Sequence, residues 1–379
     1  MTTPSHFPST DAADALCATV REFAERTLGP LADAIDREGH YPKDALRELA
    51  RLGALGAHLE APHGRGDFGL AIRAIAEISR VCGATGFMAW CQAVCGLYLQ
   101  ASGNPALTGE RLARHADGRD LGGTALSNPM KSYAQIETLL LKAQPVEGGY
   151  LVSGSLPWVS NLERGHACGA IAAVLADGQP AGRELMFLLE TDDPAVELLP
   201  CPDFSGMEGT GTYGLRLKDY RVEAARQIAD PAKPFIGGIR AAFVMLQCGI
   251  AAGVIQGAID SMRAVEPTLG HVNQYLDDRP DELQAELDAL LQRVMQLAKT
   301  PYERSDAFFL DVLDARAHGA ELALRAAQSA LLHQGARGYL MRSPVQRRVR
   351  ESHFVAIVTP AIKHLRKEMA RLSTLETPA

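Results

Sequence analysis

Several classes of function are disfavoured by what this sequence lacks. Its 379 residues contain 38 Lys and Arg against 45 Asp and Glu, a formal net charge of −7, whereas nucleic-acid-binding domains are usually basic. The polar stretch 1–11 has no apolar core of the kind that a signal peptide needs, so we expect a cytoplasmic protein. The seven cysteines include no Cys-x-x-Cys pair, which argues against a zinc site and is typical of small buried side chains in a reducing compartment.

Long hydrophobic runs are also scarce. The longest, Phe243–Ile259, is interrupted by Gln247, Gln256 and three glycines, whereas a membrane span needs about 20 mostly apolar residues. We therefore expect this run to form a buried helix of a globular protein, with no membrane and no nucleic acid among the partners. A hydrophobic content of 47% with 22% charged residues is ordinary for a soluble enzyme, and the length suggests about two or three domains.

The first part of the chain, residues 1–118, is predicted to be an all-helical domain. Three leucines at three-residue spacing precede Gly53, which suits the end of a helix. A loop is expected at 61–66 because it contains Pro and Gly, and an apolar stripe over 70–81 predicts the next helix.

The sequence pattern changes over residues 119–228. Runs rich in Val, Leu and Thr alternate with turns rich in Gly, Pro and Asp, as at 149–154, 169–175 and 213–217. This pattern predicts a central domain of short strands, arranged as an antiparallel β-barrel or sandwich.

Residues 229–379 return to a helical pattern, which completes an α+β multidomain architecture with a C-terminal four-helix bundle. Breaks are expected at 267–280 and 335–344. The first helix has more apolar surface than one face of a bundle needs, which predicts that the chain forms an oligomer through this domain. The predicted helices cover residues 235–265, 281–299, 301–333 and 350–372.

Two short stretches of the central domain stand out, Gly123–Pro129 and Gly154–Asn161. Each is predicted to be a strand that ends in a polar turn. The second places Trp158 next to a Val-Ser-Asn turn, so that a large aromatic ring and hydroxyl groups are expected to lie close together. Such a combination suits a flat ring with apolar faces and a polar edge, which is the description of a flavin.

These two stretches resemble the paired flavin-contacting segments of the acyl-CoA dehydrogenase family. In that family the first typically reads Leu-Thr-Glu-Pro and the second Gly-x-Lys-x-Trp-Ile-Thr-Asn. Here Ser127 stands in place of the first threonine, Trp158 in place of the tryptophan and Ser160 in place of the second threonine. The order of helical, β and helical domains also resembles the family. Near the C-terminus, Gly338-Tyr339, Ser343-Pro344-Val345 and Arg350-Glu351 resemble its Gly-Tyr, Pro-Val and Arg-Asp signature.

The resemblance implies a bound flavin, FAD or a reduced FMN or FAD. Its predicted contacts in the central domain are Leu126, Ser127, Trp158 and Ser160. In the family, a Gln-x-x-Gly-Gly turn and an Arg-x-x-Phe-Gly segment of a neighbouring subunit hold the far end of the cofactor. The turn is matched loosely here, which implies roles for Gln334 and Gly335.

The arginine segment of the family is replaced here by residues 266–270, which contain neither Arg nor Phe. An arginine that binds the pyrophosphate of the cofactor in a bidentate manner is a strong contact. Its absence implies weaker binding of the pyrophosphate. Arg337 or Arg279 is a candidate replacement.

The catalytic base of the family is usually a glutamate nine positions beyond the signature arginine. That position is Thr359 here, and the alternative position on the first long helix of the bundle, 235–262, is not occupied by any glutamate either. A general base must lie within hydrogen-bond reach of the proton that it removes. The candidates in this region are His353, by analogy with related flavin monooxygenases, and Glu351, which matches a family residue that is usually structural.

Three functions remain open at this stage. The first is an acyl-CoA dehydrogenase-like, FAD-dependent oxidoreductase without the usual glutamate, acting on an acyl thioester or another small molecule. The second is a monooxygenase that takes reduced flavin from a separate reductase. The third is a degenerate subunit that pairs with an active homologue. In each case we expect a homotetramer or homodimer and no metal.

Overall fold

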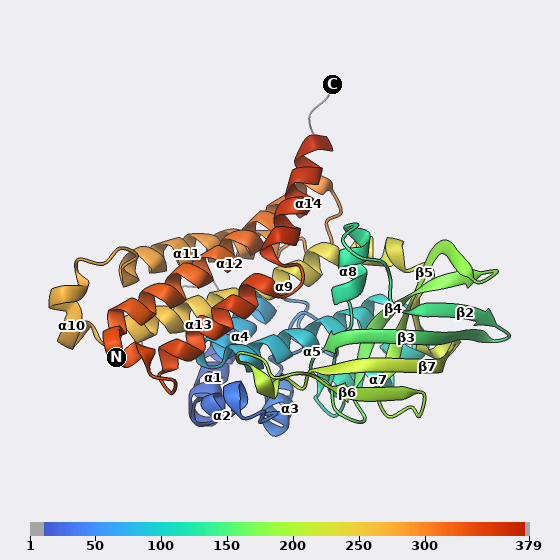
Figure 1. Cartoon of the computed structure of the whole chain (residues 1–379), viewed down its shortest axis with the longest axis horizontal. Coiled ribbons are helices and arrows are strands. Elements are labelled where there is room, and N and C mark those ends of the chain that lie inside the picture. The colour runs from blue at the N-terminus through green and yellow to red at the C-terminus, as the bar shows by residue number, and fades with distance from the viewer. Residues whose placement is uncertain (1–10, 376–379) are drawn as a thin grey trace.

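The computed structural model describes residues 11–375, in which one group of helices precedes a β-sheet in the sequence and a second group follows it. The helices form one elongated body with the sheet at one end, and α14 projects away from that body (Figure 1). The first helical group consists of α1 Asp11–Phe23, α2 Ala32–Arg37, α3 Lys43–Arg51, α4 Phe68–Val81, α5 Gly83–Ala101, α6 Pro105–Thr108 and α7 Glu110–Ala116.

The N-terminal group follows the sequence prediction. The helix expected from the apolar stripe is α4, which begins after Asp67, whose carboxylate accepts a hydrogen bond from the N–H of Leu70 at 2.8 Å. The predicted loop at 61–66 lies outside any helix. Both α4 and α5 are buried over most of their length, so they form part of the core.

The central sheet has eight strands and is mostly antiparallel. Its order is β6-β7-β3-β2-β4-β5-β8, and β1 pairs with β4. Two pairings are parallel, β1 with β4 and β2 with β4. The three predicted strands correspond to β3, β4 and β7. The strands are β1 Gly122–Thr124, β2 Lys142–Val146, β3 Gly149–Val159, β4 Ala167–Ala176, β5 Gln179–Glu190, β6 Val196–Pro200, β7 Tyr213–Glu223 and β8 Gln227–Ala229.

One local prediction for this region was wrong. The segment after β1 was expected to be a polar turn, but it forms the short helix α8, Ser127–Tyr133. Pro129 lies in the first turn of α8, where its missing N–H removes no intrahelical hydrogen bond. Ser127 therefore lies at the start of a helix, directly after the strand β1 and its connection.

The C-terminal group consists of α9 Ala232–Arg263, α10 Glu266–Asn273, α11 Pro280–Leu297, α12 Asp306–Gln334, α13 Pro344–Ile357 and α14 Ile362–Leu375. The prediction of one helix over 350–372 was wrong. The chain forms α13 and α14, which are separated at Thr359-Pro360, because the residue before a proline is disfavoured in helical geometry. The predicted break at 267–280 also contains a helix, α10.

The helix α9 is the central element of the bundle. Within residues 11–375 it alone is long and apolar enough to cross a membrane, and 94% of its most apolar window is buried inside the protein. It packs mainly on α4 and α12, which are contributed by different ends of the chain. The apolar run predicted to form a buried helix is therefore covered by protein.

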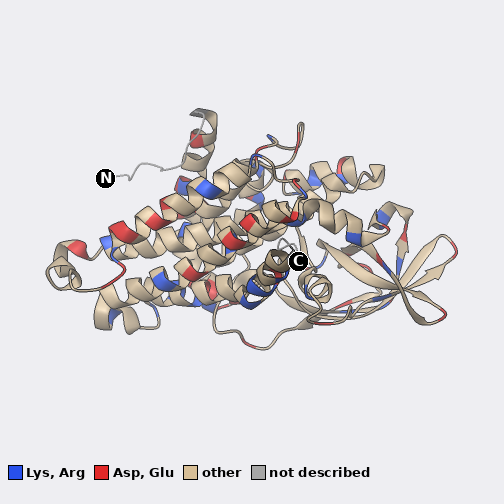
Figure 2. Ribbon diagram, turned by 90° about the horizontal axis from the view of Figure 1, so that it is seen from above, with Lys and Arg blue, Asp and Glu red and all other residues tan. Residues whose placement is uncertain are grey.

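The helical groups at the two ends of the chain share one continuous hydrophobic core, while the sheet has a second core of its own. The helix α8 and one end of β3 lie where the sheet meets the helices (Figure 1), and β1 packs on α5. Lys and Arg positions alternate with Asp and Glu positions along the helices (Figure 2). The fold thus places the two sequence motifs at the junction of sheet and helices.

Candidate functional site

The two motifs of the central domain lie against each other. The side-chain amide of Asn161 donates to the carbonyl of Gly122 at 2.6 Å. A Cβ on Gly123 would lie 2.3 Å from the carbonyl oxygen of Ser160, so only glycine permits this approach. Because β1 leads into α8, the contact brings Ser127 and Ser160 to neighbouring segments of one site.

A tyrosine from the N-terminal helical group holds the second motif. The hydroxyl of Tyr41 donates to Oδ1 of Asn161 at 2.7 Å, and Asn161 has a positive φ of 63°. An asparagine in this conformation is uncommon and is stabilised here by hydrogen bonds on both ends of its amide. Tyr41 therefore helps to fix the turn that carries Ser160.

The aromatic ring of the second motif is open to solvent. Trp158 is 58% exposed, although large aromatic side chains are usually well buried. Ser160, two residues further on, contacts the hydroxyl of Thr212 at 2.7 Å, and Thr212 contacts the hydroxyl of Thr210 at 2.8 Å. An exposed apolar ring on the same segment as a row of hydroxyls fits the faces and the polar edge of a flavin.

Ser127 connects the first motif to the C-terminal group. Its hydroxyl lies 2.9 Å from the hydroxyl of Thr359, in the short connection between α13 and α14. Leu126, beside it, has a buried side chain and donates its N–H to the hydroxyl of Thr124. The structure thus brings Ser127 and Thr359 together. Leu126 takes part through its backbone N–H, which helps to fix the connection between β1 and α8.

Two buried polar side chains, Gln247 and Arg316, hold the backbone around Thr359. The side-chain amide of Gln247, on α9, donates to the carbonyl of Thr359 at 2.9 Å. The guanidinium of Arg316, on α12, donates through Nε to Oε1 of Gln247 at 2.9 Å and through Nη2 to the carbonyl of Val355 at 2.6 Å. Both ends of the Thr359 segment are therefore tied to one arginine.

Arg316 is an unusual anchor because it is only 1% exposed and its Nη1 has no hydrogen-bond partner within the described residues. Burial lowers the pKa of Arg316 to about 10. Burying a guanidinium beside neutral amide and carbonyl acceptors costs free energy. Its hydrogen bonds hold the turn at Thr359 in a fixed position.

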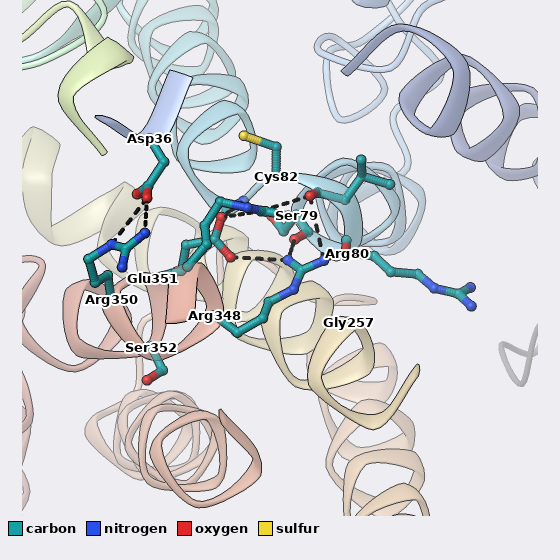
Figure 3. Close-up of polar contacts among 12 residues, drawn as sticks. Asp36, Ser79, Arg80, Cys82, Gly257, Arg348, Arg350, Glu351 and Ser352 are labelled. Carbon is teal, nitrogen blue, oxygen red and sulfur yellow. Dashed lines mark hydrogen bonds and ion pairs between the residues drawn. The ribbon is translucent and has the colours of Figure 1, made fainter. Parts of the chain in front are cut away.

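Glu351 lies in a separate buried cluster (Figure 3). Its carboxylate accepts from Arg347 at 2.7 Å, from Arg348 at 3.0 Å and from the N–H of Gly83, the first residue of α5, at 2.8 Å. Burial raises the pKa of Glu351, but the two arginines outweigh it and keep the pKa below its usual value. This carboxylate is occupied at the start of α5 and contacts neither Ser127 nor Thr359.

The signature arginine, Arg350, makes a second ion pair in the same region. It pairs with Asp36, which is 1% exposed, and Oδ1 of Asp36 accepts from the N–H of Met207 at 2.9 Å (Figure 3). This contact joins α13 to α2 and to the segment between β6 and β7. It therefore fixes the backbone that leads into the hydroxyls of Thr210 and Thr212.

The remaining predicted residues lie elsewhere. His353 is exposed on α13. Gln334 donates to the carbonyl of Ser261 at 3.0 Å, at the C-terminal end of α9, and Gly335 follows it with a φ of 60°. Ser261 is 14 residues beyond Gln247 on α9, so Gln334 is about 21 Å along the helix from Thr359, at 1.5 Å per residue.

Sequence reasoning missed several residues that shape this site. Tyr41, Thr212 and Arg316 have no local pattern that identifies them. Gln247 had a signal, since it is a polar interruption in the longest apolar run, and such residues are buried only with partners. Within residues 11–375, no group of three or more His, Cys, Asp or Glu could hold a metal ion.

Comparison with known proteins agrees with this architecture. The family profile described as "Acyl-CoA dehydrogenase, N-terminal domain" matches residues 10–119. A probable acyl-CoA dehydrogenase, YngJ, of Bacillus subtilis (strain 168) is 24% identical over 355 residues, covering 89% of this chain and 91% of the relative.

Solved structures show the same fold. Butyryl-CoA dehydrogenase from Megasphaera elsdenii superimposes with a TM-score of 0.86 at 19% identity, covering 98% of this chain and 100% of that chain. A glutaryl-CoA dehydrogenase from Mycobacterium smegmatis in complex with FADH2 superimposes with a TM-score of 0.82 at 16% identity, covering 98% and 96%. The profile match over the N-terminal part, the full-length relatives and the fold all support a similarity to the acyl-CoA dehydrogenase-like family.

Proposed function

We propose that the protein is an FAD-dependent oxidoreductase of the acyl-CoA dehydrogenase type. The observation that carries this proposal is the exposed ring of Trp158, two residues before Ser160, on a segment that packs against the segment leading to Ser127. In this proposal Trp158 covers one face of the isoalloxazine ring, and the two serines contact its polar edge. The flavin supplies electron transfer to and from a carbon substrate.

We further propose that the substrate is an acyl thioester and that no glutamate acts as base at position 359. The full-length similarity to acyl-CoA dehydrogenases supports the substrate class. A threonine hydroxyl is a very weak base, and the partner of Thr359 is another hydroxyl, Ser127, which cannot activate it. We assign no base role to Glu351, because its carboxylate is occupied by two arginines.

The test is anaerobic mixing of the FAD-loaded protein with a panel of short and branched acyl-CoA thioesters while the flavin absorbance is followed. Bleaching of oxidised FAD supports the dehydrogenase proposal. Thr359→Glu places a carboxylate beside Ser127 and is expected to accelerate bleaching, and Thr359→Gln is the matched control without a base. Binding of FAD with no bleaching by any thioester, in all three proteins, contradicts the proposal.

A second candidate is a monooxygenase that receives reduced flavin from a reductase. The Ser127–Thr359 hydroxyl pair favours it, because reaction of reduced flavin with oxygen needs no carboxylate base at this position. Oxygen uptake coupled to hydroxylation of a substrate would select this function over the first. A third candidate, a partner subunit for an active homologue, is excluded if the purified chain alone forms a stable oligomer with flavin.

We also propose that the chain assembles as a homotetramer or homodimer in the cytoplasm, with parts 1–118, 119–228 and 229–379 as its domains. Exposed apolar side chains gather near Gln334 and Gly335 after α12, as expected of a surface covered in an oligomer. In this arrangement Gln334 and Gly335 would contact the flavin of a neighbouring subunit. The exposed side chains are Leu332, Tyr339, Leu340 and Met341.

A further inference from the structure

The hydroxyls of Ser160, Thr212 and Thr210 form a hydrogen-bonded chain, and the direction of the bond at the Thr210 end is fixed. Thr210, which is 4% exposed, donates its hydroxyl hydrogen to the carbonyl of Met207 at 2.9 Å. The direction of this bond is certain because a carbonyl oxygen can only accept. The carbonyl of Met207 is held in place. Met207 has a φ of 61°, and its N–H donates to Asp36, which is itself paired with Arg350.

The fixed end determines the direction of the whole chain. A hydroxyl has one hydrogen, and that of Thr210 is used on Met207. In the 2.8 Å contact between Thr210 and Thr212, Thr212 must therefore be the donor. In the 2.7 Å contact between Thr212 and Ser160, the hydrogen of Thr212 is already used, so Ser160 must donate. The hydroxyl hydrogen of Ser160 therefore points to Thr212. Toward the proposed flavin, the oxygen of Ser160 can only accept a hydrogen bond.

This polarity distinguishes the two redox states of a flavin. In oxidised flavin N5 carries a lone pair and no hydrogen, so it would face another acceptor. After two-electron reduction N5 carries a hydrogen and can donate. We propose that Ser160 accepts a hydrogen bond from N5–H of reduced flavin, so that the site binds reduced flavin more tightly than oxidised flavin. The inference rests on the proposed function, in which Ser160 lies at the flavin edge.

Thr212 acts through Ser160 and is a positioning residue. One hydrogen bond made in one redox state and absent in the other changes the ratio of the two dissociation constants about tenfold. For a two-electron couple, tenfold corresponds to about 30 mV in reduction potential. The structure therefore assigns to Thr212 and Thr210 an effect, through Ser160, on the reduction potential of the bound flavin.

The experiment is a pair of anaerobic titrations of the apoprotein, with oxidised FAD and with dithionite-reduced FAD, together with the reduction potential of the bound flavin. The wild type is expected to favour reduced FAD. Thr212→Val removes the acceptor of Ser160, frees its hydrogen for oxidised N5, and is expected to lower the preference about tenfold. Ser160→Ala removes the contact in both states and is expected to lower the preference for reduced FAD by a similar factor. Thr19→Val, on an exposed face of α1, is the matched control.

An unchanged ratio in Thr212→Val, or a wild type that favours oxidised FAD, overturns the inference while leaving the proposed flavin site in place. Failure of the wild type to bind either form overturns the proposed function and the inference with it. If Thr212→Val does not fold, Ser160→Ala decides, because its ratio must move toward oxidised FAD. A Ser160→Ala ratio equal to that of the wild type contradicts the proposal.

Discussion

Acidification is predicted to destabilise the N-terminal helical group through two buried histidines, His58 and His115. They are 1% and 4% exposed. Burial lowers the pKa of each from 6.5 to about 4, and a nearby backbone carbonyl, of Ala93 and Gln92 respectively, offsets only part of this effect. Both imidazoles therefore stay neutral in the folded protein at pH values where they are charged in the unfolded chain.

The sign of the effect follows from proton binding. Between pH 6.5 and pH 4 the unfolded chain binds more protons than the folded protein, so the free energy of unfolding falls as the pH falls. The contribution is fully present above pH 6.5 and is lost progressively below it. From the two pKa values, each histidine costs about 2 kcal/mol of stability between pH 7.5 and pH 5.

The assay is urea unfolding of the flavin-free protein at pH 7.5 and pH 5, at one protein concentration. His58→Leu keeps a similar volume and removes one titrating group, so its stability should fall about 2 kcal/mol less than that of the wild type over this range. His353→Leu, at an exposed position, is the control and should fall as much as the wild type. An equal loss in His58→Leu and wild type refutes the reasoning.

Three further substitutions test separate contacts. Gln247→Leu leaves Nε of Arg316 unpaired in the core and is expected to lower the free energy of unfolding by about 2–3 kcal/mol, measured with urea. Tyr41→Phe removes the donor to Asn161 and is expected to weaken FAD binding about tenfold, measured by fluorescence titration; unchanged affinity contradicts the role given to Tyr41. Met341→Glu places a charge in the exposed apolar surface after α12 and is expected to dissociate the oligomer, measured by light scattering.

The order of the helical, β and helical parts could be predicted because it depends on local patterns. Apolar periodicity identified α4 and α9, and alternation with turn residues identified β3, β4 and β7. The errors fell where a proline acts on its neighbours. Pro129 starts a helix instead of a turn, and Pro360 divides a predicted helix, and in both cases the same residue type is compatible with either structure.

The support of the site could not be predicted because it depends on contacts between distant segments. Arg316 is one of many arginines on helices, and its spacing does not reveal that it points into the core. The donor direction at Ser160 depends on Met207, whose conformation is set by Asp36 from another part of the chain. Such information arises only when the tertiary structure brings three segments together.

The most direct test of the central claim is FAD binding by the wild type and by Trp158→Ala. We expect the wild type to bind FAD, and the loss of the exposed ring to weaken binding about tenfold or more, since an aromatic contact combines buried apolar area with ring stacking. Tyr302→Leu, at another partly exposed aromatic position, should bind like the wild type. Equal affinity of Trp158→Ala and wild type would contradict the flavin site described for this protein.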